Sequence, residues 1–361
     1  MKKTTTKALL SGLAIAGTAA LLAGCGSAPT GSSSSSGGDA ASDYLPCMVS
    51  DAGGFDDRSF NQLGFEGLQA AAEALGSDYR EVESATETDY ASNLQNLVDE
   101  GCNTIVTVGF LLAPAALESA TANPDIEYVS IDDPVDQDFD GTTDAENIKP
   151  IIFDTAQAAF LAGYLSAGVS ETGVVGTFGG MDIPTVTIFM DGFAQGVEYY
   201  NSVNSTSVQV LGTDSFTGGF EANDTARQAA QALIDQNVDV LLPVGGPIYQ
   251  SAAEAIRDSG REIALIGVDA DVYETDPDVA DLLLTSIRKG IDVGVQEAIT
   301  EAGEGNFDAT PFVGTLENEG VGLAPFHDWE DRVPADLATA VEELQASIIA
   351  GDITVDSYLA Q

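Results

Sequence analysis

Short apolar runs alternate with longer segments of helical periodicity along most of the chain. The runs at residues 45–50, 104–108 and 127–131 predict strands, whereas residues 60–75 repeat apolar side chains with the period of a helix. Strands that alternate with helices in this way form a parallel sheet with helices on both faces. The pattern therefore predicts an α/β fold.

A second block of the chain has the same character. Its predicted strands cover residues 174–178, 208–211, 238–243 and 263–268. Residues 94–109 align without gaps with residues 230–245, and both stretches have the pattern of a helix end, a turn, a buried strand and a glycine. We therefore expect two lobes of similar architecture. In open sheets of this kind, ligands bind beside the carboxyl ends of the strands.

The first 24 residues have the organisation of a signal peptide. Lys2, Lys3 and Lys7 form a positive start, and residues 8–23 are almost all apolar or small, a stretch too short for a spanning helix. It ends in Leu-Ala-Gly before Cys25, which resembles a bacterial lipobox, whose cysteine is lipidated and becomes the first residue of the mature protein. The alternative is a plain secretory signal with an incidental cysteine.

Residues 25–43 are the expected tether between this lipid and the folded part. They are rich in serine, glycine and alanine and contain no large apolar side chain, which is typical of a flexible linker. A lipid with several chains anchors stably, so we expect the protein to be held at the extracytoplasmic face of the cell membrane. The folded part is expected to begin near Tyr44.

Acidic residues outnumber basic ones by 58 to 12, which gives a net charge of −46. Binding to nucleic acid or to anionic lipid needs Lys and Arg, so the balance argues against both. The acidity suits either a saline exterior or simply a solubilising surface, and the sequence leaves both open. A single histidine argues against His-based metal sites and catalytic triads.

Two cysteines remain once Cys25 is assigned to the lipid. Cys47 lies in the first predicted strand, and Cys102 just precedes the next strand of the block at residues 104–108. These strands are neighbours in a doubly wound sheet, and an exported protein can form disulfides. We hypothesise a Cys47–Cys102 disulfide, with two buried free thiols as an equally weighted alternative.

The first predicted strand is followed by a glycine-containing loop from Ser50 to Gln62. Ser59 and Gln62 have the spacing of a capping box, which places Ser59 at a helix start and Phe60 and Asn61 in the first turn. An aromatic ring beside an amide suits a flat heterocycle, through stacking and edge hydrogen bonds. The alternative, which these residues alone favour, is that Phe60 packs the helix on the sheet while Asn61 faces solvent.

Carboxylates follow two other predicted strands. Asp132 and Asp133 come after one strand, and Asp269 and Asp271 come after another. A carboxylate accepts two hydrogen bonds in a fork, which suits the vicinal diol of a sugar. Aspartate is also a common turn and cap residue, which is the alternative for any single one.

Lys289 follows a further predicted strand and is expected to open a helix, where its charge opposes the helix dipole. No enzyme signature is present in the sequence: we find no Walker phosphate loop, no G-x-G-x-x-G after a strand and no G-x-S-x-G. The residues therefore favour binding over catalysis.

Several segments, in order along nearly all of the mature chain, resemble the basic membrane protein family of substrate-binding lipoproteins, which includes purine-nucleoside receptors of bacterial ABC importers. The segments are SDAGGFDDRSFNQ from Ser50, VTVGFLL from Val106, FLAGYLSA from Phe160, GTFGGMDIPTV from Gly176, IGVDAD from Ile266, LTSIRKGID from Leu284 and ENEGVGLAPFHDWED from Glu317. The resemblance implies a type I periplasmic-binding-protein fold with three crossovers between its lobes.

The resemblance also implies roles for single residues at the base of a nucleoside. Phe60 and Phe216 would sandwich the base, and Asn61 and Asp132 would hydrogen-bond its edge. A ligand role for Phe60 and Asn61 then becomes the favoured interpretation.

The sugar is expected at a second group of residues. Asp269 would hold the ribose hydroxyls with help from Lys289, and Asp51 would line the site. Gln157 departs from the family, in which an acidic residue beside a serine is common here, so contacts from this part of the second lobe are not carried over.

We expect the first lobe to comprise residues 44–154 plus 272–312, and the second residues 155–271 plus 313–361. The leading hypothesis is a monomeric receptor without cofactor or metal that binds a nucleoside between its lobes and passes it to a membrane permease. The alternatives are the same fold binding another polar metabolite such as a sugar, a nucleoside-cleaving enzyme, and a surface sensor or adhesin without transport.

Overall fold

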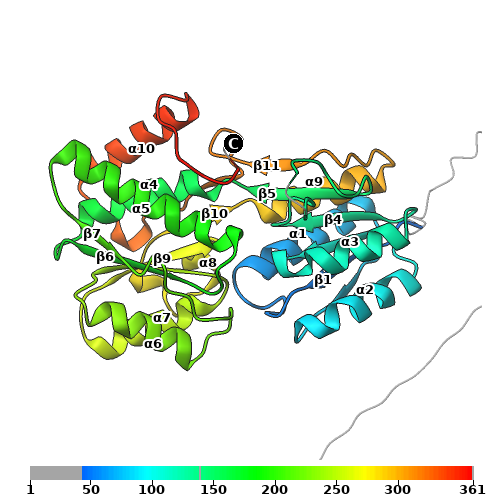
Figure 1. Ribbon diagram of the computed structural model, residues 1–361, viewed down its shortest axis with the longest axis horizontal. Coiled ribbons are helices and arrows are strands. Elements are labelled where there is room, and N and C mark those ends of the chain that lie inside the picture. The colour runs from blue at the N-terminus through cyan, green and yellow to red at the C-terminus, as the bar shows by residue number, and fades with distance from the viewer. Residues whose placement is uncertain (1–42, 138–139, 360–361) are drawn as a thin grey trace, which may run out of the picture. The chain divides into compact units, whose positions relative to one another are not determined.

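The computed structural model describes residues 43–137 and 140–359 (Figure 1). The expected signal peptide, the lipidation site at Cys25 and the linker up to residue 42 lie outside these residues. Within the described ranges, no helix combines the length and the apolarity that crossing a membrane requires.

The first sheet contains six strands in the order β11-β5-β4-β3-β1-β2, all paired in parallel. These strands are β1 (Pro46–Ser50), β2 (Arg80–Val82), β3 (Thr104–Val108), β4 (Glu127–Ile131), β5 (Ile148–Phe153) and β11 (Phe312–Gly314). Helices α1 (Phe60–Leu75) and α9 (Ile291–Gly303) cover one face, and α2 (Tyr90–Asp99) and α3 (Ala113–Ala122) cover the other. We call this sheet and its helices the first lobe.

The second sheet repeats this arrangement, with the order β12-β10-β9-β8-β6-β7. Its strands are β6 (Val174–Gly179), β7 (Gln209–Leu211), β8 (Val240–Val244), β9 (Ala264–Asp269), β10 (Leu283–Lys289) and β12 (Val321–Leu323), of which β12 runs antiparallel to β10. Helices α4 (Thr155–Val169), α5 (Pro184–Asn204) and α10 (Ala335–Ile349) lie on one face, and α6 (Asp224–Ile234), α7 (Ile248–Ser259) and the short α8 (Val272–Thr275) on the other. This is the second lobe, and the predicted fold class is confirmed.

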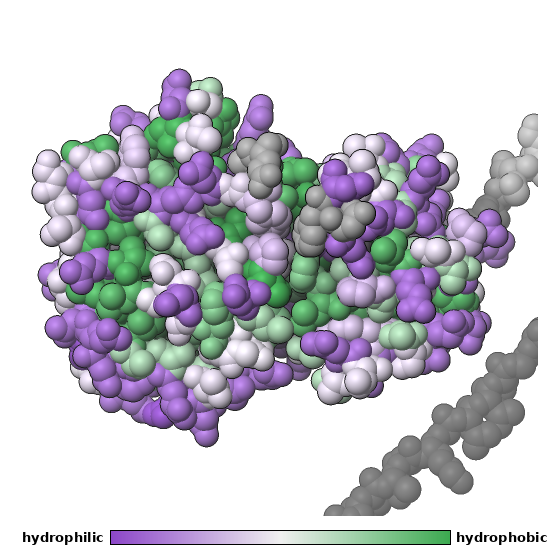
Figure 2. Space-filling view, in the orientation of Figure 1, coloured by the Kyte–Doolittle hydropathy of each residue, from purple (hydrophilic) through white to green (hydrophobic). Residues whose placement is uncertain are grey.

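Short 3₁₀ turns complete the described elements. They are η1 (Glu87–Asp89), η2 (Phe110–Leu112), η3 (Ala280–Leu282) and η4 (His327–Trp329). Figure 2 shows hydrophilic side chains over much of the visible face, with apolar side chains between them, as the acidic composition leads one to expect.

The gapless repeat in the sequence corresponds to equivalent parts of the two lobes. Residues 94–109 run from α2 through β3, and residues 230–245 run from α6 through β8. Each strand lies beside the first strand of its own sheet, and each is followed by a glycine with positive φ: 114° at Gly109 and 131° at Gly245. The repeat therefore marks the same strand-to-loop turn in both lobes.

The chain passes between the described sheets three times, from β5 to α4, from β10 to α9 and from β11 to β12. Hydrogen bonds link these crossovers: the amide of Gly290 donates to the carbonyl of Gly320 (2.9 Å), and the Gln157 side chain accepts from the amide of Leu316 (3.0 Å). Gln157 also donates to the carboxylate of Asp154 (2.8 Å). The residue that departs from the family pattern thus joins two crossovers.

Strand β10 corrects the expected division into lobes, which placed residues 272–312 in the first lobe. β10 pairs in parallel with β9 and so belongs to the second sheet, and only α9 and β11 return to the first lobe. The physical reason is that β10 is the fifth strand of its sheet, as β5 is of the first. Its apolar run is buried only if it completes that sheet before the chain crosses over.

Helix α4 is buried on nearly all sides, and its backbone approaches that of a neighbouring helix closely. Helix α5 supplies it: a Cβ atom at Gly196 would overlap the carbonyl oxygen of Phe160, and one at Gly163 would overlap that of Phe193. These glycines let the two helices pack backbone to backbone.

A disulfide joins Cys47 and Cys102, the pairing that the sequence had left open against two free thiols. Their Cα atoms are 5.9 Å apart and the bond closes a loop with a sequence separation of 55 residues. Restricting an unfolded loop of that length stabilises the native state by about 4 kcal/mol in the chain-entropy model. Both sulfurs lie near the amino ends of β1 and β3, in the core between the sheet and helices α2 and α3.

Candidate ligand-binding site

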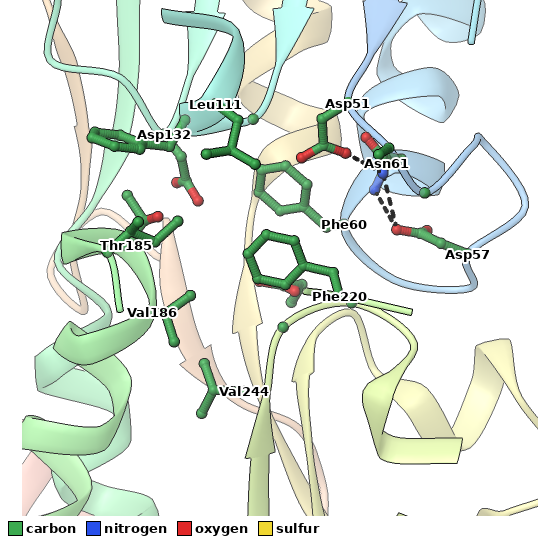
Figure 3. A pocket seen from close by; sticks show the side chains of 18 of the residues that line it. Asp51, Asp57, Phe60, Asn61, Leu111, Asp132, Thr185, Val186, Phe220 and Val244 are labelled. Atoms are coloured by element: carbon green, nitrogen blue, oxygen red, sulfur yellow. Dashed lines mark hydrogen bonds between the residues drawn. The ribbon is translucent and has the colours of Figure 1, made fainter. Parts of the chain in front are cut away.

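A hollow lies between the carboxyl ends of the two sheets (Figure 3). The residues that directly follow β1, β3 and β8 line it, namely Asp51, Gly109 and Gly245. The last residue of β9, Asp269, and the residue after β4, Asp132, line it as well. The hollow is therefore where the strand-end rule for open α/β sheets places a ligand.

Helix α1 begins at the hollow, and the carboxylate of Asp57 caps its first turn. Asp57 accepts hydrogen bonds from the backbone amides of Ser59 (2.9 Å), Asn61 (2.9 Å) and Gln62 (3.1 Å). The expected capping box between Ser59 and Gln62 is therefore wrong, because Asp57 satisfies these amides first. The hydroxyl of Ser59 instead donates across to the carbonyl of Val268 (3.0 Å) in the second lobe.

Asn61 lies between two carboxylates and is almost fully buried. Its side-chain amide donates to Asp51 Oδ1 (3.0 Å) and to Asp57 Oδ2 (3.3 Å), the two dashed contacts in Figure 3. These bonds fix the position of Asn61 at one end of the hollow.

Lys289 is a buried cation among the residues that line the hollow. Its ammonium donates to Asp132 of the first lobe (2.6 Å) and lies 3.7 Å from Asp269 Oδ1 of the second. The rings of Phe60 and Phe189 each have their centroids 5.1 Å from Lys289 Nζ, which adds cation–π attraction.

The predicted position of Lys289 at a helix start is corrected. It is the last residue of β10, and α9 begins only at Ile291. The strand extends through Lys289 because its edge pairs with β12 there. The conflict with the helix dipole therefore disappears.

Burial and mutual repulsion change the protonation of these carboxyl groups. Burial raises the pKa of Asp51 to about 7, opposed by the hydrogen bond from Asn61 and reinforced by the charges of Asp57, Asp132 and Asp269. Burial likewise raises the pKa of Asp269 to about 6, although Lys289 opposes the rise. Both carboxyl groups therefore release their protons at higher pH than an exposed aspartate does.

Phenylalanine rings from both lobes line the hollow, among them Phe60 from the start of α1 and Phe220 from the loop before α6 (Figure 3). Cβ atoms at Gly180 or Gly245 would overlap the Phe220 ring, so these two glycines make room for it. The lobes thus supply opposing aromatic faces.

Phe216, which we expected opposite Phe60, does not line the hollow. It forms an isolated bridge with Gly179 at the end of β6 and packs against the core. Phe216 and Phe220 lie four residues apart in one loop, so composition and spacing do not distinguish the ring that faces a ligand from the ring that anchors the loop. The carry-over from the family chose the anchoring ring.

The other expected ligand contacts all line the hollow: Asp51, Phe60, Asn61, Asp132, Asp269 and Lys289. Asp133 does not line it, because its carboxylate accepts from Ser130 and from the amide of Val135. Among the lining residues that we missed, Thr185 and Val186 fall in the GTFGGMDIPTV segment, which the resemblance had marked without assigning single residues.

Comparison with known proteins matches this architecture to one family. The family model described as "ABC transporter substrate-binding protein PnrA-like" matches residues 45–357. The chain belongs to this family. The resemblance seen in the sequence is thereby confirmed, and the chain is a member of a family of ABC transporter substrate-binding proteins.

Individual relatives extend over nearly the whole chain. The CD4+ T-cell-stimulating antigen of Listeria innocua is 31% identical, over 98% of this chain and 99% of its own. The ABC transporter nucleoside-binding protein BmpA of Lactococcus lactis is 28% identical, over 96% and 98%. A solved ABC transporter solute-binding protein from Aeropyrum pernix has a TM-score of 0.77 and 26% identity, over 86% of this chain and 92% of its own.

We predict that the ligand-free protein loses stability as pH rises from about 4 to 8. A carboxyl group whose pKa is about 7 when folded and near 4 when unfolded holds its proton better in the native state, so its stabilising effect disappears across this window. Urea unfolding at a series of pH values measures the slope. Asp51→Asn should make the slope shallower, by up to about 1.4 kcal/mol per pH unit.

The matched control is Asp125→Asn, which changes an exposed carboxylate outside the hollow and should leave the slope as in the wild type. An Asp51→Asn protein with an unchanged slope would show that this carboxyl group is ionised normally in the folded state.

Proposed function

We propose that the protein captures a purine nucleoside between its two lobes and delivers it to the permease of an ABC importer. The observation that carries this proposal is the pair of rings, Phe60 and Phe220, that project from opposite lobes into a hollow rich in buried carboxylates. The relative from Lactococcus lactis, whose name states that it binds nucleosides, supports the same ligand class.

The two rings suit the flat base. A heterocycle between opposing aromatic faces gains about 1–3 kcal/mol from each stacked ring, and every purine offers such faces. Because the rings come from different lobes, the base can be stacked on both sides only when the lobes close around it. Stacking thus couples ligand capture to closure.

The cluster of Lys289, Asp132 and Asp269 suits the ribose. Asp269 is almost completely buried, lies 3.3 Å from the Ser59 hydroxyl, which it shares as an acceptor with the Val268 carbonyl, and forms an ion pair with Lys289. A vicinal diol donates two hydrogen bonds to one carboxylate and accepts from an ammonium. Ribose hydroxyls match these groups, and no bond needs to be made or broken.

Delivery requires the protein to stay near its permease. We propose that residues 1–24 are a signal peptide, that Cys25 carries the lipid, and that residues 25–43 tether a monomeric receptor to the outer face of the membrane. A tether raises the effective concentration of the receptor at its membrane partner.

Titration calorimetry with inosine, guanosine and adenosine tests the function. We expect binding of purine nucleosides by the wild type and a loss of about 1.5–3 kcal/mol of binding free energy per hydrogen bond removed in Asp269→Ala. Asp271→Ala, which changes a carboxylate just outside the hollow, should bind as the wild type does. Equal affinities of the Asp269→Ala protein and the wild type would exclude the ribose role.

Mass spectrometry of ligand released from gently purified protein distinguishes the alternatives. In a second experiment, a nucleoside is incubated with the protein. Its intact recovery supports a receptor, whereas cleavage to base and sugar indicates an enzyme. A released sugar or another metabolite would replace the nucleoside in the proposal.

Phe220→Leu and Phe216→Leu form a second, internally controlled test. The Phe220 variant should lose about 1–3 kcal/mol of nucleoside affinity because a stacking face disappears. The Phe216 variant should lose thermal stability but keep its affinity, because this ring packs in the core. The reverse result would return Phe216 to the site.

Cys25→Ala tests the anchor. In cells that express the variant, we expect the protein to move from the membrane fraction to the soluble extracytoplasmic fraction, because the lipid has lost its attachment atom. Metabolic labelling with a fatty-acid analogue should mark the wild type alone. A membrane-bound, unlabelled Cys25→Ala protein together with an unlabelled wild type would exclude lipidation at this residue.

A further inference from the structure

The loop between β1 and α1 fastens the first lobe to the second through two consecutive residues, Arg58 and Ser59. The guanidinium of Arg58 forms an ion pair with Asp276, which directly follows α8. The backbone carbonyl of Arg58 accepts a hydrogen bond from the hydroxyl of Thr275 (2.7 Å). The hydroxyl of Ser59 donates to the carbonyl of Val268 (3.0 Å). In Figure 1 this loop, drawn in blue, extends from the first lobe toward α8.

Asp276 is a carboxylate that the second lobe holds in a fixed position. It is almost completely buried, and its Oδ2 accepts a hydrogen bond from the Tyr249 hydroxyl of α7 (2.9 Å). Burial raises the pKa of Tyr249, so this hydroxyl keeps the proton that it donates. The Oδ1 atom accepts from the amide of Asp278 (3.3 Å) and contacts the guanidinium of Arg58. The charge of this carboxylate is therefore paired with a cation from the other lobe.

Arg58 has a backbone conformation that its own side chain disfavours. Its φ is 59°, in the left-handed region where a Cβ atom crowds the backbone. Such a conformation persists where the surrounding contacts hold it. Thr275 at the carbonyl and Asp276 at the guanidinium both belong to the second lobe. The opposite lobe therefore helps to hold this turn.

This contact lies beside the hollow rather than in it. Asp57 and Phe60, which flank the two contacting residues, line the hollow. Arg58 and Asp276 instead line a separate groove. The side chain of Arg58 is 43% exposed there, so water and salt reach it. A change in this ion pair can therefore reach a ligand only through the position of the lobes.

We propose that Arg58 is a positioning residue that latches the lobes together: its ion pair with Asp276 stabilises the closed arrangement and slows ligand release without touching the ligand. The identity of the ligand rests on the proposed function, whereas the latch rests on the contacts between the lobes. A latch lowers the free energy of the closed state, and the population of that state changes by the corresponding factor. Because the lobes close after the ligand has entered, loss of the latch should appear mainly in the dissociation rate.

Release of radiolabelled guanosine into excess unlabelled guanosine tests the latch. Arg58→Ala removes the guanidinium but keeps a Cβ atom, so the disfavoured backbone conformation is the same in both proteins. We expect release to become about three- to thirtyfold faster, as follows from the loss of a charge-assisted hydrogen bond that is partly screened by solvent. A release rate equal to that of the wild type would overturn the proposal.

The matched control is Arg257→Ala. It removes an arginine from the same groove, but the partner of this arginine, Asp281, lies in the same lobe. Release from this variant should remain as in the wild type. An equal acceleration in both variants would show a general effect of lost positive charge and would exclude the latch.

A double-mutant cycle separates a latch from a local loss of structure. Asp276→Asn keeps the shape of the side chain and an acceptor for Tyr249 but removes the charge. If Arg58 and Asp276 act as one contact, the double variant should release guanosine no faster than the faster single variant. Effects that multiply in the double variant would show two independent defects and would exclude the latch.

Ionic strength supplies a readout that a merely structural role would not change. Salt screens an ion pair that is partly exposed, so the ratio of the Arg58→Ala release rate to the wild-type rate should fall toward one between about 0.05 and 1 M NaCl. A ratio that stays constant over this range would exclude an electrostatic latch.

The latch and the proposed function fail in different ways. If nucleosides bind but Arg58→Ala releases them at the wild-type rate, the receptor function stands and the latch is excluded. If no purine nucleoside binds the wild type, the proposed function is excluded, and small-angle scattering of the ligand-free proteins decides on the latch. Arg58→Ala should then have a larger average radius of gyration than Arg257→Ala, because the open arrangement is more populated. Equal radii would exclude the latch.

Discussion

The buried ion cluster of Lys289, Asp132 and Asp269 joins the two lobes inside the hollow, and the other lining residues are arranged around it. One carboxylate comes from the first lobe, and the other carboxylate and the ammonium come from the second. Taking such charges out of water costs several kcal/mol per ion, and the pairing offsets this cost only in part, so the cluster is not there for stability. In the proposed function, a polar ligand completes the hydrogen bonds of these groups.

The two lobes share one local feature at the hollow, a glycine turn after a buried strand. In each lobe, a buried strand ends in a glycine with positive φ, Gly109 in one and Gly245 in the other. Gly109 leaves room for the carboxylate of Asp51, and Gly245 leaves room for the ring of Phe220. The repeated backbone turn thus makes room for a polar group in the first lobe and for an apolar one in the second.

The strands, the helices and the location of the hollow could largely be predicted from the sequence, because buried positions give a periodic pattern of apolar residues. Strands β3 and β4 and helix α1 have the predicted bounds, and the strand-end rule located the hollow. What failed depended on competition between neighbours. The carboxylate of Asp57 accepts the amide hydrogen bonds that we expected Ser59 and Gln62 to satisfy. Phe220 rather than Phe216 lines the hollow, because tertiary packing distinguishes two rings that are equivalent in type. The division into lobes failed where β10 joined the nearer sheet instead of crossing over.

The Cys47–Cys102 disulfide depends on where in the cell the chain is. Cys47 and Cys102 hold together the amino ends of β1 and β3, the same two strands whose carboxyl ends present Asp51 and Gly109. Thiols stay reduced in a cytosol and pair in an oxidising exterior. A newly made chain therefore lacks this restraint until it has been exported. The bond can form only after export. It then fixes the register of β1 and β3 covalently at their amino ends, away from the hollow at their carboxyl ends.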